Sequence, residues 1–424
     1  MLFFDIVLFF NPSLFIVPFQ NKSYMTSLKS SLVKLSYLLN FIGSGSTPKQ
    51  NMNYYHGTIS WVTLGDLNDS YIHKTLRTIT TKAMQDTHLY LFPPNSLLVG
   101  LNGSVFKLGL LSIEATINQN CCGLVCNPHL LSYKYLFYFI LYYRFFCFLN
   151  PKSVLFASIT SSILKSIKLP FCSLSKQQEL ISFLDRKYHL IQELFQKIDL
   201  LLKKLEEYQK ALLYDTLMHQ KTPTTIIKLK YLSTLKGRIG WQALTTQEYQ
   251  QQGAYLVTGV NIQQGVIDWS SCYHVSEERY KMDPNIQLQE NDLIITKDGT
   301  IGKVAIIQNL PSIATLNSGL MLIRKKSPVF YSEKYLYYLL SSFYFHQWYA
   351  LTLKPNSTIL HLYQKDFLNF PVLLCPLNAQ QELCIYLDHK MNILKKLQSH
   401  YTSLKGYLEE YQASLLYETF QHLS

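Results

Sequence analysis

The chain has 424 residues, 48% of them apolar, so it is long enough to form two or three domains with substantial cores, and a disordered chain is excluded. Lys and Arg outnumber Asp and Glu by 39 to 27, and the net charge of +12 favours a polyanionic partner such as nucleic acid. The eight cysteines have no spacing typical of a disulfide framework, which favours a cytoplasmic location.

Residues 1–24 are apolar and resemble a signal peptide or membrane anchor in that respect alone. No positively charged segment precedes the apolar run, Asp5 interrupts it, and Pro12 and Pro18 would break a membrane-spanning helix. We interpret residues 1–24 as an upstream extension of the reading frame or a tail, with Met25 as a second candidate start. A membrane anchor is the alternative.

Residues 25–170 form the first predicted domain, which is rich in strand-like runs. Within it, Cys121, Cys122, Cys126 and His129 are close enough in sequence to be considered as zinc ligands. The adjacent pair, however, would point to opposite faces of a strand and could hardly reach one tetrahedral ion. We therefore expect a buried strand here and no metal site.

The run 131–149 is the other membrane candidate, because it is apolar and aromatic almost throughout. It carries Lys134 and Arg144 in its interior, and its counterpart from Tyr335 is shorter and amphipathic. Both runs are therefore predicted to be buried helices of globular domains, and no membrane partner is expected.

A stretch within residues 171–221 recurs within residues 374–424. Residues 174–219 and 377–422 align without a gap and share QQEL, LD, LEEYQ and LLY. Apolar residues recur at steps of three and four over more than four heptads in each copy, which predicts two long helices. At 1.5 Å per residue, about thirty residues make a rod of roughly 45 Å. We expect the two helices to pair as an antiparallel coiled coil; the alternative is an amphipathic helix packed on a globular core.

Residues 222–373 form the second predicted domain, and the linker KTPTT (221–225) marks its start. Three pairs of segments repeat between the domains: 59–67 with 254–262, 95–109 with 291–305, and 115–120 with 314–319. The chain therefore reads as an internal duplication in the order domain, helix, domain, helix.

No motif for catalysis or for a cofactor is found. The sequence lacks an amino-group methylation tetrad, a Gly-rich phosphate loop ending in GK[ST], and a convincing nuclease set. Lys297 and Asp298 could imitate part of a catalytic site, but Asp-Gly between two strands is more typical of a β-turn. We predict that the chain by itself is not an enzyme and binds no cofactor.

Several of these segments resemble the specificity subunit of type I restriction-modification systems. The matching phrases are GSTPKQNMNYYHGTISWVTLGDL (45–67) and EATINQN (114–120) in the first domain, and KGRIGWQALTTQEY (236–249), YLVTGVNI (255–262), DLIITKDGTIGKVA (292–305) and STILHLYQKDFLNFPV (357–372) in the second. The second domain follows the pattern more closely, since Phe106 stands where the second domain has Gly302. The resemblance implies an α+β fold with two target recognition domains alternating with two helical spacers.

The resemblance also implies binding of double-stranded DNA by the loops of both domains. The cations that suit phosphate contacts are Lys49, Lys107, Lys236, Arg238, Lys297 and Lys303. The side chains that suit base edges are Asn102, Gln119, Asn261, Asn317, Ser357, Thr358, His361 and Gln364. The strands that carry the repeated motif add Trp61, Thr63 and Thr258 to the predicted DNA-binding set. Because the two domains differ in sequence, we expect two different half-sites separated by an unread gap.

Two methyltransferase subunits and additional restriction subunits are the protein partners that the resemblance implies. Their docking surface is expected on the exposed faces of the two helices, at Lys203, Lys204, Glu206, Glu207, Gln209, Glu409, Glu410 and Gln412. Two alternatives stay open: a subunit of a related system whose partner fuses methylation and cleavage, and a membrane-associated coiled-coil protein.

Overall fold

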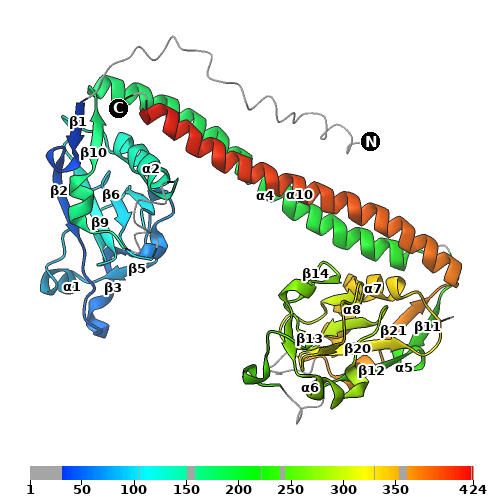
Figure 1. Cartoon of the computed structure of the whole chain (residues 1–424). Helices are drawn as coiled ribbons and strands as arrows, with labels where there is room; N and C mark the ends of the chain where they lie inside the picture. Colours follow the sequence, from blue (N-terminus) through cyan, green and yellow to red (C-terminus); the bar gives the residue numbers. More distant parts are fainter. Residues whose placement is uncertain are drawn as a thin grey trace. The chain divides into compact units, whose positions relative to one another are not determined.

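The computed structural model describes residues 31–103, 105–149, 158–220, 222–238, 244–328, 330–352, 361–421 and 423; the side chains of residues 146–149 and 246 are not included. The chain divides into two compact units (Figure 1). Unit 1 comprises Met1–Lys197 and Ser403–Ser424, and unit 2 comprises Ile198–Thr402. The expectation for residues 1–24 lies outside the described residues.

The domain of unit 1 is built on a five-stranded sheet. Its strands, in spatial order, are β2 (Leu39–Ser44), β9 (Cys121–Cys126), β6 (Leu97–Gly100), β7 (Leu108–Leu111) and β4 (Ser70–Ile72). A three-stranded sheet contains β5 (Arg77–Ile79), β3 (Tyr55–Val62) and β8 (Thr116–Ile117), and β1 (Ser31–Lys34) pairs with β10 (Lys168–Phe171). The helices are α1 (Thr81–Asp86), α2 (Tyr133–Leu149) and α3 (Ser161–Ser166).

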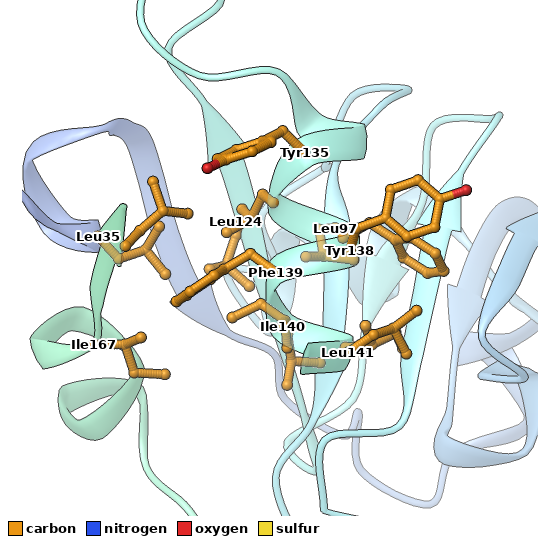
Figure 2. Packing of buried hydrophobic residues seen from close by; sticks show 14 of the residues in the cluster. Leu35, Leu97, Leu124, Tyr135, Tyr138, Phe139, Ile140, Leu141 and Ile167 are labelled. Atoms are coloured by element: carbon orange, nitrogen blue, oxygen red, sulfur yellow. The ribbon is translucent and has the colours of Figure 1, made fainter. Parts of the chain in front are cut away.

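The core of this domain lies between α2 and the five-stranded sheet. Figure 2 shows Leu97 and Leu124 of the sheet beside Phe139 and Ile140 of α2. Residues 135–141 of α2 are all buried, so the predicted buried helix is confirmed for this part of the run 131–149. Among the described residues, no helix combines the length and the apolar character needed to cross a membrane.

The predicted buried strand with adjacent cysteines is β9. Cys121 packs in one apolar cluster and Cys122 in another, as expected for neighbours that point to opposite faces of a sheet. Burial raises the pKa of Cys121 to about 12 and that of Cys122 to about 11, so both thiols are held protonated. The described residues contain no group of three or more potential metal ligands.

The domain of unit 2 repeats this plan. Its four-stranded sheet contains β12 (Ser233–Gly237), β20 (Leu320–Lys325), β17 (Leu293–Thr296) and β18 (Val304–Ile306), and its three-stranded sheet contains β16 (Tyr273–Val275), β13 (Ala254–Val257) and β19 (Ala314–Leu316). The hairpin β14 (Ile262–Gln263) and β15 (Val266–Ile267) and the pair β11 (Thr225–Lys228) and β21 (Pro371–Leu374) complete the strands. The helices are α5 (Leu229–Leu232), α6 (Glu277–Lys281), α7 (Glu333–Ser341), α8 (Phe343–Thr352) and α9 (Gln364–Phe367).

Strand register confirms the internal duplication. In unit 1, β3 runs parallel to β8, with Val62 opposite Ile117. In unit 2, β13 runs parallel to β19, with Val257 opposite Leu316. The sequence pairs that predicted the duplication thus occupy equivalent places in two separately folded domains.

The two long helices are α4 (Leu174–Met218) and α10 (Leu377–Gln421). Unit 1 contains the beginning of α4 and the end of α10, whereas unit 2 contains the end of α4 and the beginning of α10. In unit 1, Leu184 and Ile191 of α4 share a core with Leu415 of α10. The helices therefore run in opposite directions beside each other (Figure 1), and the predicted antiparallel pairing is confirmed.

A buried glutamine near the start of each long helix joins it to its domain. In unit 1, the Gln177 amide donates to the carbonyls of Leu130 (2.9 Å) and Cys172 (3.0 Å) and accepts from Ser132 N–H at 2.8 Å. Gln177 is 0% exposed. The amide thus satisfies three backbone groups at the joint between the domain and the helix.

The same joint recurs in unit 2. The amide of Gln380 accepts from Ser332 N–H at 2.9 Å and donates to the Cys375 carbonyl at 2.9 Å. Gln380 is 1% exposed, whereas its neighbour Gln381 is exposed. The QQ pair of the repeat therefore has one structural member and one surface member.

Two turns further along, an aspartate strengthens each joint. In unit 1, Asp185 of α4 accepts hydrogen bonds from Lys134 at 2.6 Å and from the Tyr138 hydroxyl at 2.7 Å. Asp388 of α10 accepts from Lys334 at 2.6 Å and from Tyr338 at 2.5 Å in unit 2. The Lys134 that argued against a membrane span is therefore the cation of this joint.

We predict that Gln380→Ala lowers the free energy of unfolding by roughly 2–4 kcal/mol, because it leaves the half-buried Ser332 N–H and the buried Cys375 carbonyl without partners. Gln381→Ala is the matched control and should change the stability by less than about 0.5 kcal/mol. Denaturant unfolding of the purified chain measures both. Equal effects of the two substitutions would contradict the assigned role of Gln380.

Candidate nucleic-acid interface

In unit 2, the ends of several strands bring together segments that are far apart in sequence. Lys297 N–H donates to the Gly319 carbonyl at 2.9 Å, and the Lys297 carbonyl accepts from Leu362 N–H at 2.9 Å. The Gln364 amide donates to the Leu235 carbonyl at 3.0 Å. The segments 236–238, 297–303, 317–319 and 361–364, all predicted to face DNA, therefore meet at one place.

The turn after β13 belongs to the same place. A Cβ at Gly259 would lie 3.2 Å from Cγ2 of Thr296, the last residue of β17. Asn317 N–H donates to the Val257 carbonyl at 2.9 Å. The turn 258–261 thus lies against the start of the loop 297–303.

Cations line this group of segments. Lys236 and Lys303 are exposed and Lys297 is half-buried. Nζ of Lys297 lies 3.6 Å from the place that a Cβ at Gly237 would occupy, so this lysine reaches across to the end of β12. Three lysines on adjacent segments suit a phosphate backbone.

One ionisable pair is found among them. Nδ1 of His361 contacts a carboxylate oxygen of Asp298, and the imidazole ring lies 4.6 Å from the Tyr363 ring. The predicted turn at 297–303 is confirmed: it joins β17 to β18, and Gly299 has φ of +68°.

Unit 1 assembles the equivalent segments. Leu101 N–H donates to the Asn120 carbonyl and Ile159 N–H to the Leu101 carbonyl, both at 2.8 Å. The Asn102 amide donates to Asn120 Oδ1 at 3.3 Å, and the Thr47 hydroxyl contacts the Gln119 amide oxygen. The side chains of Lys49, Asn102 and Gln119 are exposed, and that of Lys107 is half-buried.

Phe106 occupies the same turn position as Gly302. The φ angles are +60° and +88°, and the two N–H groups donate to the carbonyls of Gly100 and Thr296, respectively. Phe106 is 2% exposed and packs against the ring of Tyr143. Burial of this ring offsets the cost of a left-handed conformation, so the turn is kept without glycine.

Three side chains of the predicted DNA-binding set are not accessible. Trp61, Arg238 and Asn261 are 3%, 3% and 0% exposed. Nε of Arg238 donates to the Leu316 carbonyl at 2.9 Å, and burial lowers the pKa of this guanidinium. The structure contradicts the expected accessibility of these three side chains, because tertiary packing encloses them.

Asn261 is instead the cap of its turn. Its Oδ1 accepts from the N–H and the hydroxyl of Thr258, at 2.8 and 2.7 Å, and its Nδ2 donates to the Ser271 carbonyl at 3.0 Å. The Thr258 hydroxyl therefore donates its hydrogen bond within the turn. The sequence signal for this role is a Thr followed three residues later by Asn.

Unit 1 caps the equivalent turn with Asp66, which the predicted set omitted. Oδ2 of Asp66 accepts from the N–H and hydroxyl of Thr63 at 2.8 and 2.9 Å, and Oδ1 accepts from Leu76 N–H at 2.8 Å. Thr63 and Thr258 thus have the same internal role.

Of the remaining predicted residues, the structure places Asn317 half-buried, donating to the Tyr249 hydroxyl at 3.1 Å, and Gln364 exposed. Ser357 and Thr358 lie outside the described residues. On the long helices the predicted docking residues Lys203, Lys204, Glu206, Glu207, Glu409 and Glu410 are exposed, whereas Gln209 and Gln412 are half-buried.

The family model of the type I restriction modification DNA specificity domain matches this chain twice, over residues 30–203 and 228–400. The chain belongs to this family. Each match covers one domain and most of the long helix that follows it, which is the unit of the duplication.

A curated protein with a similar sequence supports this family membership. The type I restriction enzyme MjaIX specificity subunit of Methanocaldococcus jannaschii is 27% identical over 149 residues. That alignment covers 34% of this chain and 34% of that protein, so the matched part is about a third of the curated relative's length.

Two solved structures share the fold. One comes from a study of complex assembly and conformational transition of the type I R-M system; at 13% identity it covers 93% of this chain and 98% of its own, with a TM-score of 0.71. The HsdS subunit of Thermoanaerobacter tengcongensis, also 13% identical, covers 93% of this chain and 97% of its own, with a TM-score of 0.51. This specificity-family chain thus has the duplicated α+β fold inferred from its sequence.

We predict that Asn261→Ala lowers the free energy of unfolding by roughly 2–3 kcal/mol, because the Thr258 N–H and the Ser271 carbonyl lose their partner. Gln263→Ala, an exposed neighbour, is the control. Thermal unfolding of the purified chain compares them. A fully stable Asn261→Ala variant with an altered base preference would restore the direct-contact hypothesis.

Proposed function

We propose that this chain is the DNA-recognition subunit of a type I restriction-modification complex and reads a bipartite, asymmetric target in double-stranded DNA. The observation that carries the proposal is the convergence, in each domain, of the repeated motif segments at one group of strand ends with exposed lysines and amides. Lysines position a protein on phosphates, and amides read base edges in the major groove.

The bipartite target follows from the duplication. Each domain has its own core and its own copy of the interface, so each reads its own half-site. The side chains of the two copies differ: Asp298 and His361 pair where unit 1 pairs the backbones of Asn102 and Ser158. Two frames with different surface groups call for two different half-sites, and the target is not a palindrome.

The chain acts, in this proposal, without catalysis of its own. Two methyltransferase subunits dock on the exposed faces of the paired helices, and restriction subunits join that core. The exposed Lys203, Lys204, Glu206 and Glu207 of α4 and Glu409 and Glu410 of α10 support such a docking surface. The assembled complex then supplies DNA methylation and ATP-dependent cleavage.

We expect Lys297→Ala and Lys303→Ala each to weaken DNA binding by the assembled complex and to reduce the salt dependence by about one unit of slope, because each removes one phosphate contact. Lys281→Ala on α6, a helix outside the converging segments, is the control. Binding titrations at several salt concentrations measure the slopes. If both interface variants keep the wild-type slope, the interface has been placed on the wrong segments.

A second experiment tests the division of labour between subunits. The purified chain should transfer no methyl group to DNA, and methylation of a defined target should arise once a methyltransferase partner is added. Incorporation of radiolabelled methyl groups measures this. Methyl transfer by the rigorously purified chain would overturn the proposal.

A further inference from the structure

We propose that each recognition domain presents one apolar side chain, Val260 in unit 2 and Leu76 in unit 1, that contacts the C5-methyl group of a thymine in the target. The inference rests on the proposed DNA-binding function and adds to it a group that reads a specific base. Val260 lies within the repeated segment 254–262 and Leu76 lies outside the repeated segments, and neither residue is in the DNA-binding set predicted from the sequence.

Both side chains lie at the capped turn that follows the central motif strand. Val260 is the third residue of the turn 258–261, and its side chain is 75% exposed. Gly65 holds the corresponding place in the turn 63–66 of unit 1, where Leu76 is 78% exposed. Cδ1 of Leu76 lies 3.6 Å from the place that a Cβ at Gly65 would occupy. An apolar group therefore fills similar space in both domains, although different segments supply it.

The apolar side chain comes from the loop before β5 in unit 1 and from the turn in unit 2. Asp66 binds the N–H of Leu76, and Asn261 binds the carbonyl and hydroxyl of Ser271, so the loop before β5 and the loop before β16 meet their turns in equivalent ways. Unit 1 combines a glycine in the turn with a leucine from the loop. Unit 2 combines a valine in the turn with a serine from the loop. One exposed apolar side chain therefore lies at each turn, from the loop in unit 1 and from the turn itself in unit 2.

The turns hold these side chains in fixed positions. Asn261 is fully buried and bonds to both Thr258 and Ser271, which leaves the turn little freedom. Asp66 bonds to Thr63 and to the N–H of Leu76 itself. A single exposed aliphatic residue is common on protein surfaces and needs no explanation. Two exposed aliphatic residues at equivalent capped turns do need an explanation. The turn of unit 2 lies against Thr296, and Cδ1 of Leu64 in the turn of unit 1 lies 4.0 Å from the place that a Cβ at Gly103 would occupy.

The residues beside the turn 258–261 indicate which DNA group Val260 contacts. The turn 258–261 lies against Thr296, directly before Lys297, so a phosphate backbone bound by that lysine would bring base edges to the turn. Thymine is the base whose major-groove edge carries a methyl group, and apolar side chains contact it there. An apolar group fixed among polar and cationic ones therefore fits a thymine methyl.

Replacing thymine by uracil removes this methyl group and leaves every hydrogen-bonding group of the base unchanged. We expect the wild-type complex to lose affinity about fourfold, the effect of one buried methyl-sized group, at one thymine of the half-site read by unit 2. The probe is a DNA duplex with the sequence of the motif that the complex methylates, in which one thymine at a time is replaced by uracil. Val260→Ala should bind the thymine and uracil duplexes equally well, and Val266→Ala, whose side chain is 48% exposed on β15, should discriminate as the wild type does.

Leu76→Ala should abolish discrimination in the other half-site alone. The inference is overturned if no thymine replacement weakens wild-type binding in the half-site read by unit 2, if that half-site contains no thymine on either strand, or if Val260→Ala discriminates like the wild type. The Lys297→Ala variant distinguishes a failure of the thymine contact from a failure of the proposed DNA-binding face. When that variant binds DNA more weakly but the uracil duplexes show no effect, the thymine contact fails and the DNA-binding face stands; when neither has an effect, the face itself is wrong.

Discussion

The buried glutamine at the start of each long helix is the interaction on which the rest of each unit depends. Gln177 and Gln380 are the members of the QQ pairs that turn inward, and their amides bond to backbone groups on both sides of the boundary between domain and helix. Because a buried amide without its partners is costly, the helix can leave the domain in one direction only. Asp185 and Asp388 fix the same boundary again two turns later. Each domain therefore carries its recognition segments on a frame that is rigidly tied to a segment of the paired helices.

The two units use one frame to display different chemistry. The parallel pairing of the motif strands and the capped turn are the same in both, whereas the exposed groups above them differ. A carboxylate and an imidazole pair at Asp298 and His361, at the place where Asn102 and Ser158 lie side by side in unit 1. Duplication followed by such surface changes accounts for a chain that presents two distinct reading surfaces on one scaffold.

The sequence predicts the scaffold better than the reading surface. The helices follow from periodicity over four heptads, and the duplication follows from the alignment of the two copies without a gap. Both signals are carried by many residues at once. Accessibility depends instead on a few neighbours distant in sequence. Asn261 has the chemistry of a base-reading residue, yet the serine ten positions later completes its hydrogen bonds and buries it. Arg238 has the chemistry of a phosphate ligand, yet in the fold its guanidinium donates to the Leu316 carbonyl and is buried. The T-x-x-N and T-x-x-D patterns could have identified the capping role, whereas the exposure of Leu76 over Gly65 could not be read from sequence.

Single-molecule methylation sequencing of the host genome, with and without this gene, tests the central claim most directly. We expect a methylated motif made of two unequal half-sites separated by a fixed gap, present in the strain that carries the gene and lost in the strain that lacks it. Restoring the gene should restore the same motif. An identical set of methylated motifs in both strains, with the partner methyltransferase expressed, would contradict a role in DNA sequence recognition.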